Sequence, residues 1–123
     1  MQVSKSRLKK EVKKRIFNTF YQAVGDIKNS KEAQLFVSDF LTEMEKITLA
    51  KRLMVAYLLE KGKSYEFIKK EIRVSSATIA SVDKMMGKKS RGFALVLKKI
   101  EADQWASNTA KKVSKFVENI VGK

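Results

Sequence analysis

The chain contains no cysteine and no histidine among its 123 residues. Without cysteine it forms neither disulfides nor thiolate nucleophiles. Without histidine it lacks the commonest general base and the commonest transition-metal ligand. The sequence also has no glycine-rich phosphate-binding loop, and its carboxylates do not group into a metal-binding motif. We therefore expect a protein that is not an enzyme and that needs no metal or other cofactor.

Proline is absent as well, and there are only five glycines. These two residues interrupt helices most strongly, and a chain rich in Lys, Glu, Leu and Ala favours helices. Hydrophobic residues make up 44% of the sequence and charged residues 33%, which is typical of a folded chain. The length suits one domain with one hydrophobic core. We predict an all-α protein with a single domain over residues 1–123.

Positive charge is what the sequence has in excess. Its 27 Lys and Arg residues outnumber 13 Asp and Glu residues, for a net charge of +14. Such a balance favours polyanions as partners, nucleic acid first and anionic membrane second. The apolar residues after the basic N-terminus are interrupted by Asn18, Thr19 and Gln22, so no secretory leader is predicted. We expect a cytoplasmic, nucleoid-associated protein.

Apolar spacing predicts six or seven helices. A basic helix lies within residues 1–28, from about residue 5 to Asp26, and its second half carries an aromatic stripe. A short helix follows, with Ser30 as its N-cap. The side chains expected to be buried on that short helix are Leu35, Phe36 and Phe40.

The central helix is predicted from Glu43 to Lys61. Thr42 and Glu45 have the spacing of a capping box, in which each side chain accepts a hydrogen bond from the backbone amide of the other residue. Gly62 is a natural C-terminal stop. The apolar face of this helix is expected to consist of Ile47, Ala50, Leu53, Met54, Tyr57 and Leu58.

Residues 64–87 have the pattern of a helix-turn-helix, with Ser64 and Ser75 as the two N-caps. In this motif, two apolar positions on the first helix, one in the turn and two on the second helix form a small core. The residues with this spacing are Ile68, Ile72, Val74, Ile79 and Val82. Arg73 occupies the turn position where glycine is frequent, and a left-handed arginine there would cost about 1 kcal/mol. An ordinary helical hairpin is the alternative for this pattern.

Two C-terminal helices are predicted within residues 91–121. The first starts near Arg91, and the second extends from about Asp103 to Val121. The apolar stripe of the second consists of Val113, Phe116, Val117, Ile120 and Val121.

The segment from Phe40 to Val82 combines several of these features in a fixed order. They are Leu41-Thr42, Glu45, Leu49, Arg52, Leu59, Gly62, Ser64-Tyr65, Ile68, Val74-Ser75 and Ala77-Thr78-Ile79. This order resembles the tryptophan-repressor-like family, including its YerC/YecD-type branch, and the segment RGFALVL at residues 91–97 is similar to that branch too. The resemblance implies an intertwined, all-helical homodimer that regulates transcription, as a repressor, by placing paired recognition helices in successive major grooves of double-stranded DNA.

The residues of the second motif helix agree with such a role. With Ile79, Val82 and Met86 facing inward, the outward face carries small side chains, which let a helix approach base edges closely, contact thymine methyl groups and leave room for bridging water. The residues predicted to read bases are Ser75, Ser76, Ala77, Thr78, Ala80, Ser81 and Lys84.

The flanks of this helix supply the positive charge that it lacks. Residues 61–99 hold 11 basic and three acidic residues, a net charge of +8. Phosphate contacts position a protein on the duplex without reading its sequence. The residues predicted to contact phosphates are Ser64, Lys69, Lys70, Arg73, Lys88, Lys89 and Arg91.

Corepressor binding is a separate question. The resemblance implies that an amino-acid ligand would lie between the central helix and the recognition helix, held by a threonine, an arginine and an Arg-Gly pair. Thr42 and Arg52 match the first two, whereas Ser81 and Val82 stand in place of the pair. Thr42 is also explained as a helix cap, and Arg52 by pairing with an acidic neighbour such as Glu45. We predict that tryptophan is not a corepressor of this protein.

Three other functions remain open at this point. The basic N-terminal helix and the basic flanks of the motif could bind any duplex, as in a non-specific architectural protein. The amphipathic terminal helices could lie on an anionic membrane surface. RNA binding is the weakest, because the aromatic residues fall on apolar stripes instead of forming an evident base-stacking surface.

Overall fold

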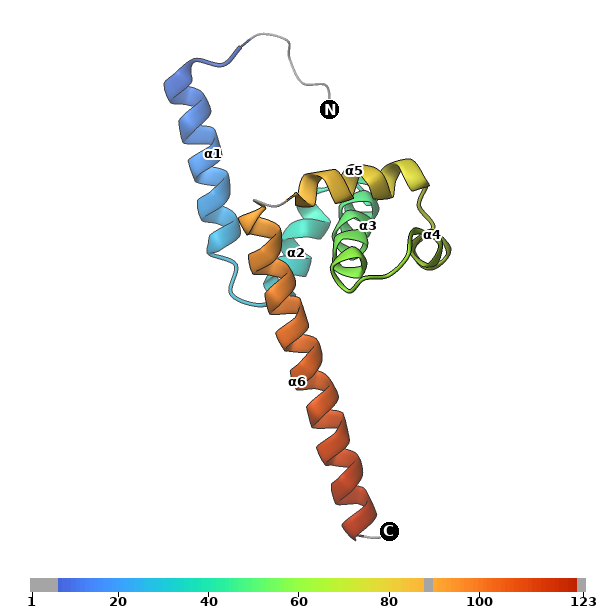
Figure 1. Ribbon diagram of the computed structural model, residues 1–123. Coiled ribbons are helices and arrows are strands. Elements are labelled where there is room, and N and C mark those ends of the chain that lie inside the picture. Colours follow the sequence, from blue (N-terminus) through green and yellow to red (C-terminus); the bar gives the residue numbers. More distant parts are fainter. Residues whose placement is uncertain (1–6, 88–89, 122–123) are drawn as a thin grey trace. The chain divides into compact units, whose positions relative to one another are not determined.

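The computed structural model describes residues 7–87 and 90–121. In the last helix it describes the side chains of all residues except 109, 110, 112, 114, 116, 120 and 121. Every regular element in these residues is a helix, which confirms the all-α class, and six helices are present. Figure 1 shows them in order along the chain. The helices are α1 (Lys10–Gly25), α2 (Ser30–Phe40), α3 (Glu43–Glu60), α4 (Tyr65–Ile72), α5 (Ser76–Met86) and α6 (Arg91–Val121).

The chain divides into two compact units, residues 1–46 and 47–123. In the first unit, α1 and α2 are joined through aromatic side chains. The Phe20 and Phe40 rings stack with their centroids 5.9 Å apart, and Phe36 stacks on Phe40 at 4.9 Å. Neither helix contains a fully buried residue. The aromatic residues of this unit therefore contact each other while much of their surface stays accessible.

The helix starts show which capping predictions are right. Thr42 Oγ1 accepts from the Glu45 amide at 3.1 Å, and the Glu45 carboxylate accepts from the Thr42 amide at 2.8 Å. The predicted capping box is thereby confirmed, and these bonds lower the pKa of the Glu45 carboxyl. The prediction for α2 is wrong by one residue. Asn29 is the N-cap, and its side chain accepts from the Glu32 amide at 2.9 Å, so Ser30 is the first residue of the helix.

The hydrophobic core of the second unit is small and lies around the helix-turn-helix. It brings together one pair from α3, one residue from α4, two from α5 and one from α6. The buried residues are Val55, Ala56, Ile68, Ile79, Val82 and Leu97, with Ile72, Val74 and Met86 packed against them. All five apolar residues of the predicted motif core are in this cluster, which confirms that part of the pattern. Figure 1 shows α4 and α5 joined by a short turn.

Three expectations about burial and helix ends are wrong for the single chain. Leu35 and Phe40 are 63% and 56% exposed, and Ile47, Leu53 and Met54 on α3 are exposed too. The predicted face of α3 is right only for Tyr57 and Leu58, which pack against the core beside the buried Val55 and Ala56. The aromatic residues of α1, for which the sequence predicts only a shared stripe, are exposed as well. The two predicted C-terminal helices form one continuous α6 (Figure 1). No proline lies between Arg91 and Val121, and its one glycine, Gly92, lies in the first turn, so nothing there stops a helix.

Candidate nucleic-acid interface

The turn between α4 and α5 fixes how the second helix is presented. Arg73 ends α4 in the left-handed conformation, with φ 62° and ψ 58°, at the turn position where glycine is frequent. Its amide donates to the Lys69 carbonyl at 3.0 Å, and its carbonyl accepts from Lys51 Nζ at 3.1 Å. A side chain of α3 therefore holds the turn from outside the motif.

Two hydroxyl caps start the motif helices. Ser64 Oγ accepts from the Phe67 amide at 3.1 Å, and Ser75 Oγ accepts from the Thr78 amide at 3.1 Å. Both caps are confirmed. The Ser75 and Thr78 hydroxyl groups also share a hydrogen bond of 3.0 Å. Each cap satisfies an end amide that would otherwise lack a partner, and this is worth about 1 kcal/mol per helix.

One contact between the motif helices has no signal in the sequence. The Tyr65 hydroxyl donates to the Asp83 carboxylate at 2.9 Å, and this bond raises the pKa of the tyrosine. It joins the start of α4 to the middle of α5, beside the buried contact of Ile68 with Ile79 and Val82. Residues 18 apart in the sequence follow no periodicity that would pair them. The bond adds to what fixes the orientation of α5.

The outward face of α5 consists of small residues followed by a single cation. Ile79 and Val82 are buried and Met86 is half-buried, which confirms the inward face. Ser76, Ala77, Ala80, Ser81 and Lys84 are all exposed. Ala77, Ala80 and Lys84 are spaced three and four residues apart, so they lie in one row along the helix.

The structure divides the predicted base-reading residues into two groups. Ser75, Thr78 and Ser81 line a cavity of about 510 Å³ between α3 and the motif, whereas Ser76, Ala77, Ala80 and Lys84 do not. Arg52, one of the two predicted ligand-binding residues, lines the same cavity, together with Lys51, Thr48 and Met85. Thr42 is engaged in the capping box of α3. The described ion pairs join Lys46 to Glu43 and Lys61 to Glu101, so the pairing of Arg52 with Glu45 is not present among the described residues.

Basic side chains gather on the first helix of the motif. Lys69, Lys70 and Arg73 line one groove along α4, together with Glu66, and all four are exposed. Ser64 lies at the start of the same helix, where its hydroxyl is part of the cap. Arg91 begins α6. Lys88 and Lys89 lie outside the described residues. The structure thus brings three of the predicted phosphate-contacting side chains together.

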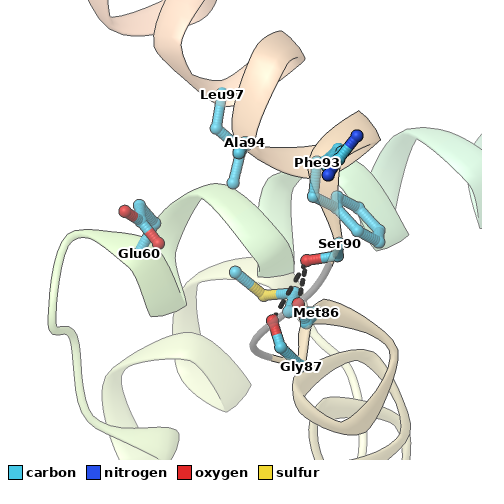
Figure 2. A pocket seen from close by; sticks show the side chains of 8 residues that line it. Glu60, Met86, Gly87, Ser90, Phe93, Ala94 and Leu97 are labelled. Carbon is cyan, nitrogen blue, oxygen red and sulfur yellow. Dashed lines mark hydrogen bonds between the residues drawn. The ribbon is translucent and has the colours of Figure 1, made fainter.

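The junction that supports the end of α5 is shown in Figure 2. A cavity of about 780 Å³ is lined by residues from the ends of α3 and α5 and the start of α6. The Met86 side chain points into it, and the Ser90 hydroxyl donates to the carbonyl groups of Met86 and Gly87. Its lining is largely apolar apart from Glu60, Ser90 and Arg91. No cluster of three or more metal-ligating side chains occurs in the part of the chain that the structure describes.

A polar cluster farther along the same face of α6 connects that helix to the end of α3. Lys61 Nζ and the Tyr57 hydroxyl donate to the Glu101 carboxylate, at 2.7 Å and 3.0 Å. The pKa of Glu101 is lowered by Lys61 first and Tyr57 second. The pKa of Lys61 is raised by its bond to Glu101, and that of Tyr57 is raised by burial and by Glu101. The cluster fixes α6 against the helix that also holds the turn.

Comparison with known proteins identifies this arrangement. The family model described as Trp repressor protein matches residues 15–101, well over half of the chain. The chain belongs to the Trp repressor family. Its helix-turn-helix is the part of the matched region that carries the small-residue face and the basic groove described above. No helix in the described residues is both long enough and apolar enough to cross a membrane.

Individual relatives agree with this family assignment. The chain is 27% identical over 109 residues to a Bacillus subtilis protein, the uncharacterized protein YerC, with 89% of this chain and 99% of that protein covered. It is similar to the crystal structure of a putative Trp repressor from Staphylococcus aureus, with a TM-score of 0.68, 24% identity and coverage of 78% and 96%. A TrpR-like protein from Eubacterium eligens gives a TM-score of 0.68 at 26% identity, with coverage of 76% and 96%. The fold is therefore Trp-repressor-like.

Proposed function

We propose that this member of the Trp repressor family is a transcriptional repressor that binds double-stranded DNA sequence-specifically as a homodimer, with α5 in the major groove. The observation that carries the proposal is the combination of an exposed small-residue face on α5, with Ala77 and Ala80, and the exposed cations that line the groove of α4. Small side chains allow the helix backbone to approach base edges, and the neighbouring cations supply the phosphate contacts that orient it.

The rigidity of the motif supports a reading function. α5 is fixed by the core under Ile79 and Val82, by the Ser75 cap, and by the bond from Tyr65 to Asp83. A good bidentate contact to a base is worth only about 1–3 kcal/mol. Base recognition by hydrogen bonds and methyl contacts therefore needs a helix that is held in one position, so that these contacts keep their geometry.

A homodimer is supported by the surface that the single chain leaves uncovered. The exposed apolar residues of the first unit include Phe17, Tyr21, Leu35, Phe40 and Met44, each at least 45% exposed. Exposed apolar side chains in this number are typical of a surface that another molecule covers. A two-fold dimer would present two copies of α5 to two half-sites of a pseudo-palindrome.

The test begins with selection of bound duplexes from a random pool, followed by affinity measurements on the recovered site and on random duplex at one fixed salt concentration. We expect a palindromic site with much the higher affinity. Replacing Ala77 with Phe should change the preferred sequence, whereas Lys70→Gln, at a predicted phosphate contact, should weaken binding to both duplexes and reduce the salt dependence. If Ala77→Phe left preference and affinity unchanged, the proposed face would be wrong.

Equal affinities for the two duplexes would favour a different function. The chain would then be an architectural protein, whose basic flanks bind any duplex through its phosphates. The specific observation behind this second candidate is the concentration of charge, a net +8 over residues 61–99, where only three residues are acidic.

We also propose that tryptophan is not a corepressor. Ser81 lines the same cavity as Arg52 and contributes only a hydroxyl to it. An arginine in place of Ser81 would provide the flat cationic surface on which an indole ring stacks. Val82 is 2% exposed and belongs to the motif core. Isothermal calorimetry should record no heat of binding on titration with tryptophan, and the affinity for DNA should be the same with and without it. A saturable heat would overturn this proposal.

A further inference from the structure

Positive charge occurs in two separate blocks of the sequence. Residues 61–99 carry +8, and residues 7–15 carry six basic residues and one acidic residue, a net +5. Residues 16–60, which lie between them, have a net charge of −1. The two blocks thus hold almost all of the total of +14. Residues 7–15 are called the N-terminal basic block below. This block is not part of the motif and lies almost entirely before the region that the family model matches, residues 15–101.

All charged side chains of the N-terminal basic block are exposed. They are Arg7, Lys9, Lys10, Glu11, Lys13, Lys14 and Arg15. None of the described ion pairs involves them. Like charges four residues apart on a helix, such as Lys10 and Lys14, repel each other and destabilise the helix. The block therefore presents a dense cationic surface that the described ion pairs do not neutralise.

The lysines at the start of α1 also interact unfavourably with the helix dipole. Lys9 is the N-cap and makes no side-chain cap hydrogen bond, and Glu11 is the only acidic residue of the first turn. The positive end of the helix dipole favours anions, so lysines at this end are unfavourable. A polyanion bound here would relieve both the repulsion between lysines and the unfavourable interaction with the dipole.

The arrangement of polar and apolar residues distinguishes DNA from a membrane as the partner. Lys10, Lys14, Phe17 and Tyr21 follow one another at intervals of four, three and four residues, so they form one row along α1. An interfacial membrane helix has its cations on one side and its apolar residues on the other. Here the cations and the aromatic residues share one side and are separated along the axis. The basic half of α1 therefore projects charge beyond an apolar half.

We infer that the N-terminal basic block is a second DNA-binding surface, which binds backbone phosphates other than those bound by the helix-turn-helix. This inference rests on the proposed DNA-binding function. The binding is independent of base sequence, because lysine and arginine side chains on an exposed helix end bind phosphates through charge. It increases the affinity for any duplex and steepens the salt dependence of that affinity.

The experiment compares the salt dependence of DNA affinity in three full-length proteins: the unaltered chain, K10Q/K13Q/K14Q, and a control, K28Q/K31Q/K111Q. Both variants remove the same charge at exposed helix or loop positions, and glutamine has nearly the helix propensity of lysine. In the block variant we expect the slope of log K against log salt to become less steep by about 0.9 for each phosphate that is no longer neutralised. This amounts to roughly 2.7 for the three lysines of each bound N-terminal basic block. The control should change the slope much less, and the fall should be equal on selected and random duplexes.

The other outcomes separate this inference from the proposed function. A slope unchanged in the block variant, with selective binding retained, overturns the inference alone. An equal fall in the control also overturns it, since total charge would then explain the effect. A reduced slope without any preference for the selected duplex supports the second surface and overturns sequence-specific reading. Flotation with phosphatidylglycerol vesicles at physiological salt that depends on the block, together with an unchanged DNA slope, assigns the block to membranes and overturns the inference.

Discussion

At the residue scale, the backbone conformation of Arg73 is the most unusual feature of the chain. It is the only residue other than glycine with positive φ among the described residues. A side chain in this conformation costs about 1 kcal/mol because Cβ crowds the carbonyl oxygen. The hydrogen bonds at this position are made by the backbone, with the Lys51 ammonium and the Lys69 carbonyl. The arginine side chain is therefore not needed for the turn itself, and it lies in the groove with Lys69 and Lys70.

This separation leads to a prediction for two variants at one position. Arg73→Gly should be more stable than Arg73→Ala by about 1 kcal/mol, since only alanine keeps the left-handed strain. Both variants should lose the same DNA affinity, because both remove the cation. Urea denaturation and duplex binding measure the two effects. Equal stability of the variants would show that the turn relaxes without the arginine.

The Glu101 carboxylate makes stability depend on pH. Its pKa in the folded chain is lowered by Lys61 and Tyr57, whereas the unfolded pKa is near the ordinary value of about 4.3. A group with a lowered folded pKa stabilises the protein above the unfolded pKa, and this contribution disappears as pH falls through the folded value. Glu101→Gln should therefore be less stable than the unaltered chain at neutral pH, and the difference should shrink below about pH 4. Denaturation at both pH values measures it, and a difference independent of pH would contradict the assignment.

At the element scale, local chemistry explains which predictions are right. Caps, the box of Thr42 and Glu45, and the five-residue motif core depend on residues a few positions apart, so their spacing is visible in the sequence. Asn29 and Ser30 are adjacent and both are good caps, and only the backbone conformation decides between them. The continuity of α6 is also hard to predict, because apolar residues recur only weakly between residues 97 and 103, as they would at a helix boundary.

Burial could be predicted only in part, for a different reason. Periodicity shows which side chains share a face of a helix, but not which molecule covers that face. Val55 and Ala56 are covered by the chain itself, whereas Leu35 and Phe40 remain exposed in it. The bond from Tyr65 to Asp83 and the cluster around Glu101 join distant positions. Such pairs follow from the packed fold and have no local pattern.

The two neighbouring serines at the start of α5 have different expected effects. Ser75→Ala removes the oxygen that accepts from the Thr78 amide, so it should cost about 1 kcal/mol of stability. Ser76 is exposed and is the first residue of α5, so Ser76→Ala should leave stability within about 0.5 kcal/mol. On the selected duplex, Ser76→Ala should reduce sequence preference. Thermal denaturation and competition binding separate the two effects, and similar destabilisation by both changes would argue against Ser75 as the effective cap.

At the scale of the whole molecule, folding of the single chain leaves an unusual amount of apolar surface uncovered. Among the residues that the structure describes, six form the buried core and 21 large hydrophobic residues are exposed. A net charge of +14 keeps separate copies apart at long range, but the aromatic residues of α1 and α2 carry none of that charge. A dimer that buries this surface would add the hydrophobic stabilisation that the single chain lacks.

A homodimer formed in this way gives a final prediction. The unaltered chain should sediment with twice its mass of 14.0 kDa at micromolar concentration. Leu35→Glu should weaken the dimer by a factor of about ten or more, because Leu35 is 63% exposed in the single chain and a carboxylate buried in an apolar interface loses its hydration without a partner. Gln34→Glu places the same side chain at the neighbouring exposed position of α2 and should have little effect. Sedimentation equilibrium of the three proteins decides the matter. If the unaltered chain remained a monomer at tens of micromolar, the exposed face of α2 would need another partner, and two half-sites could not be read by one stable assembly.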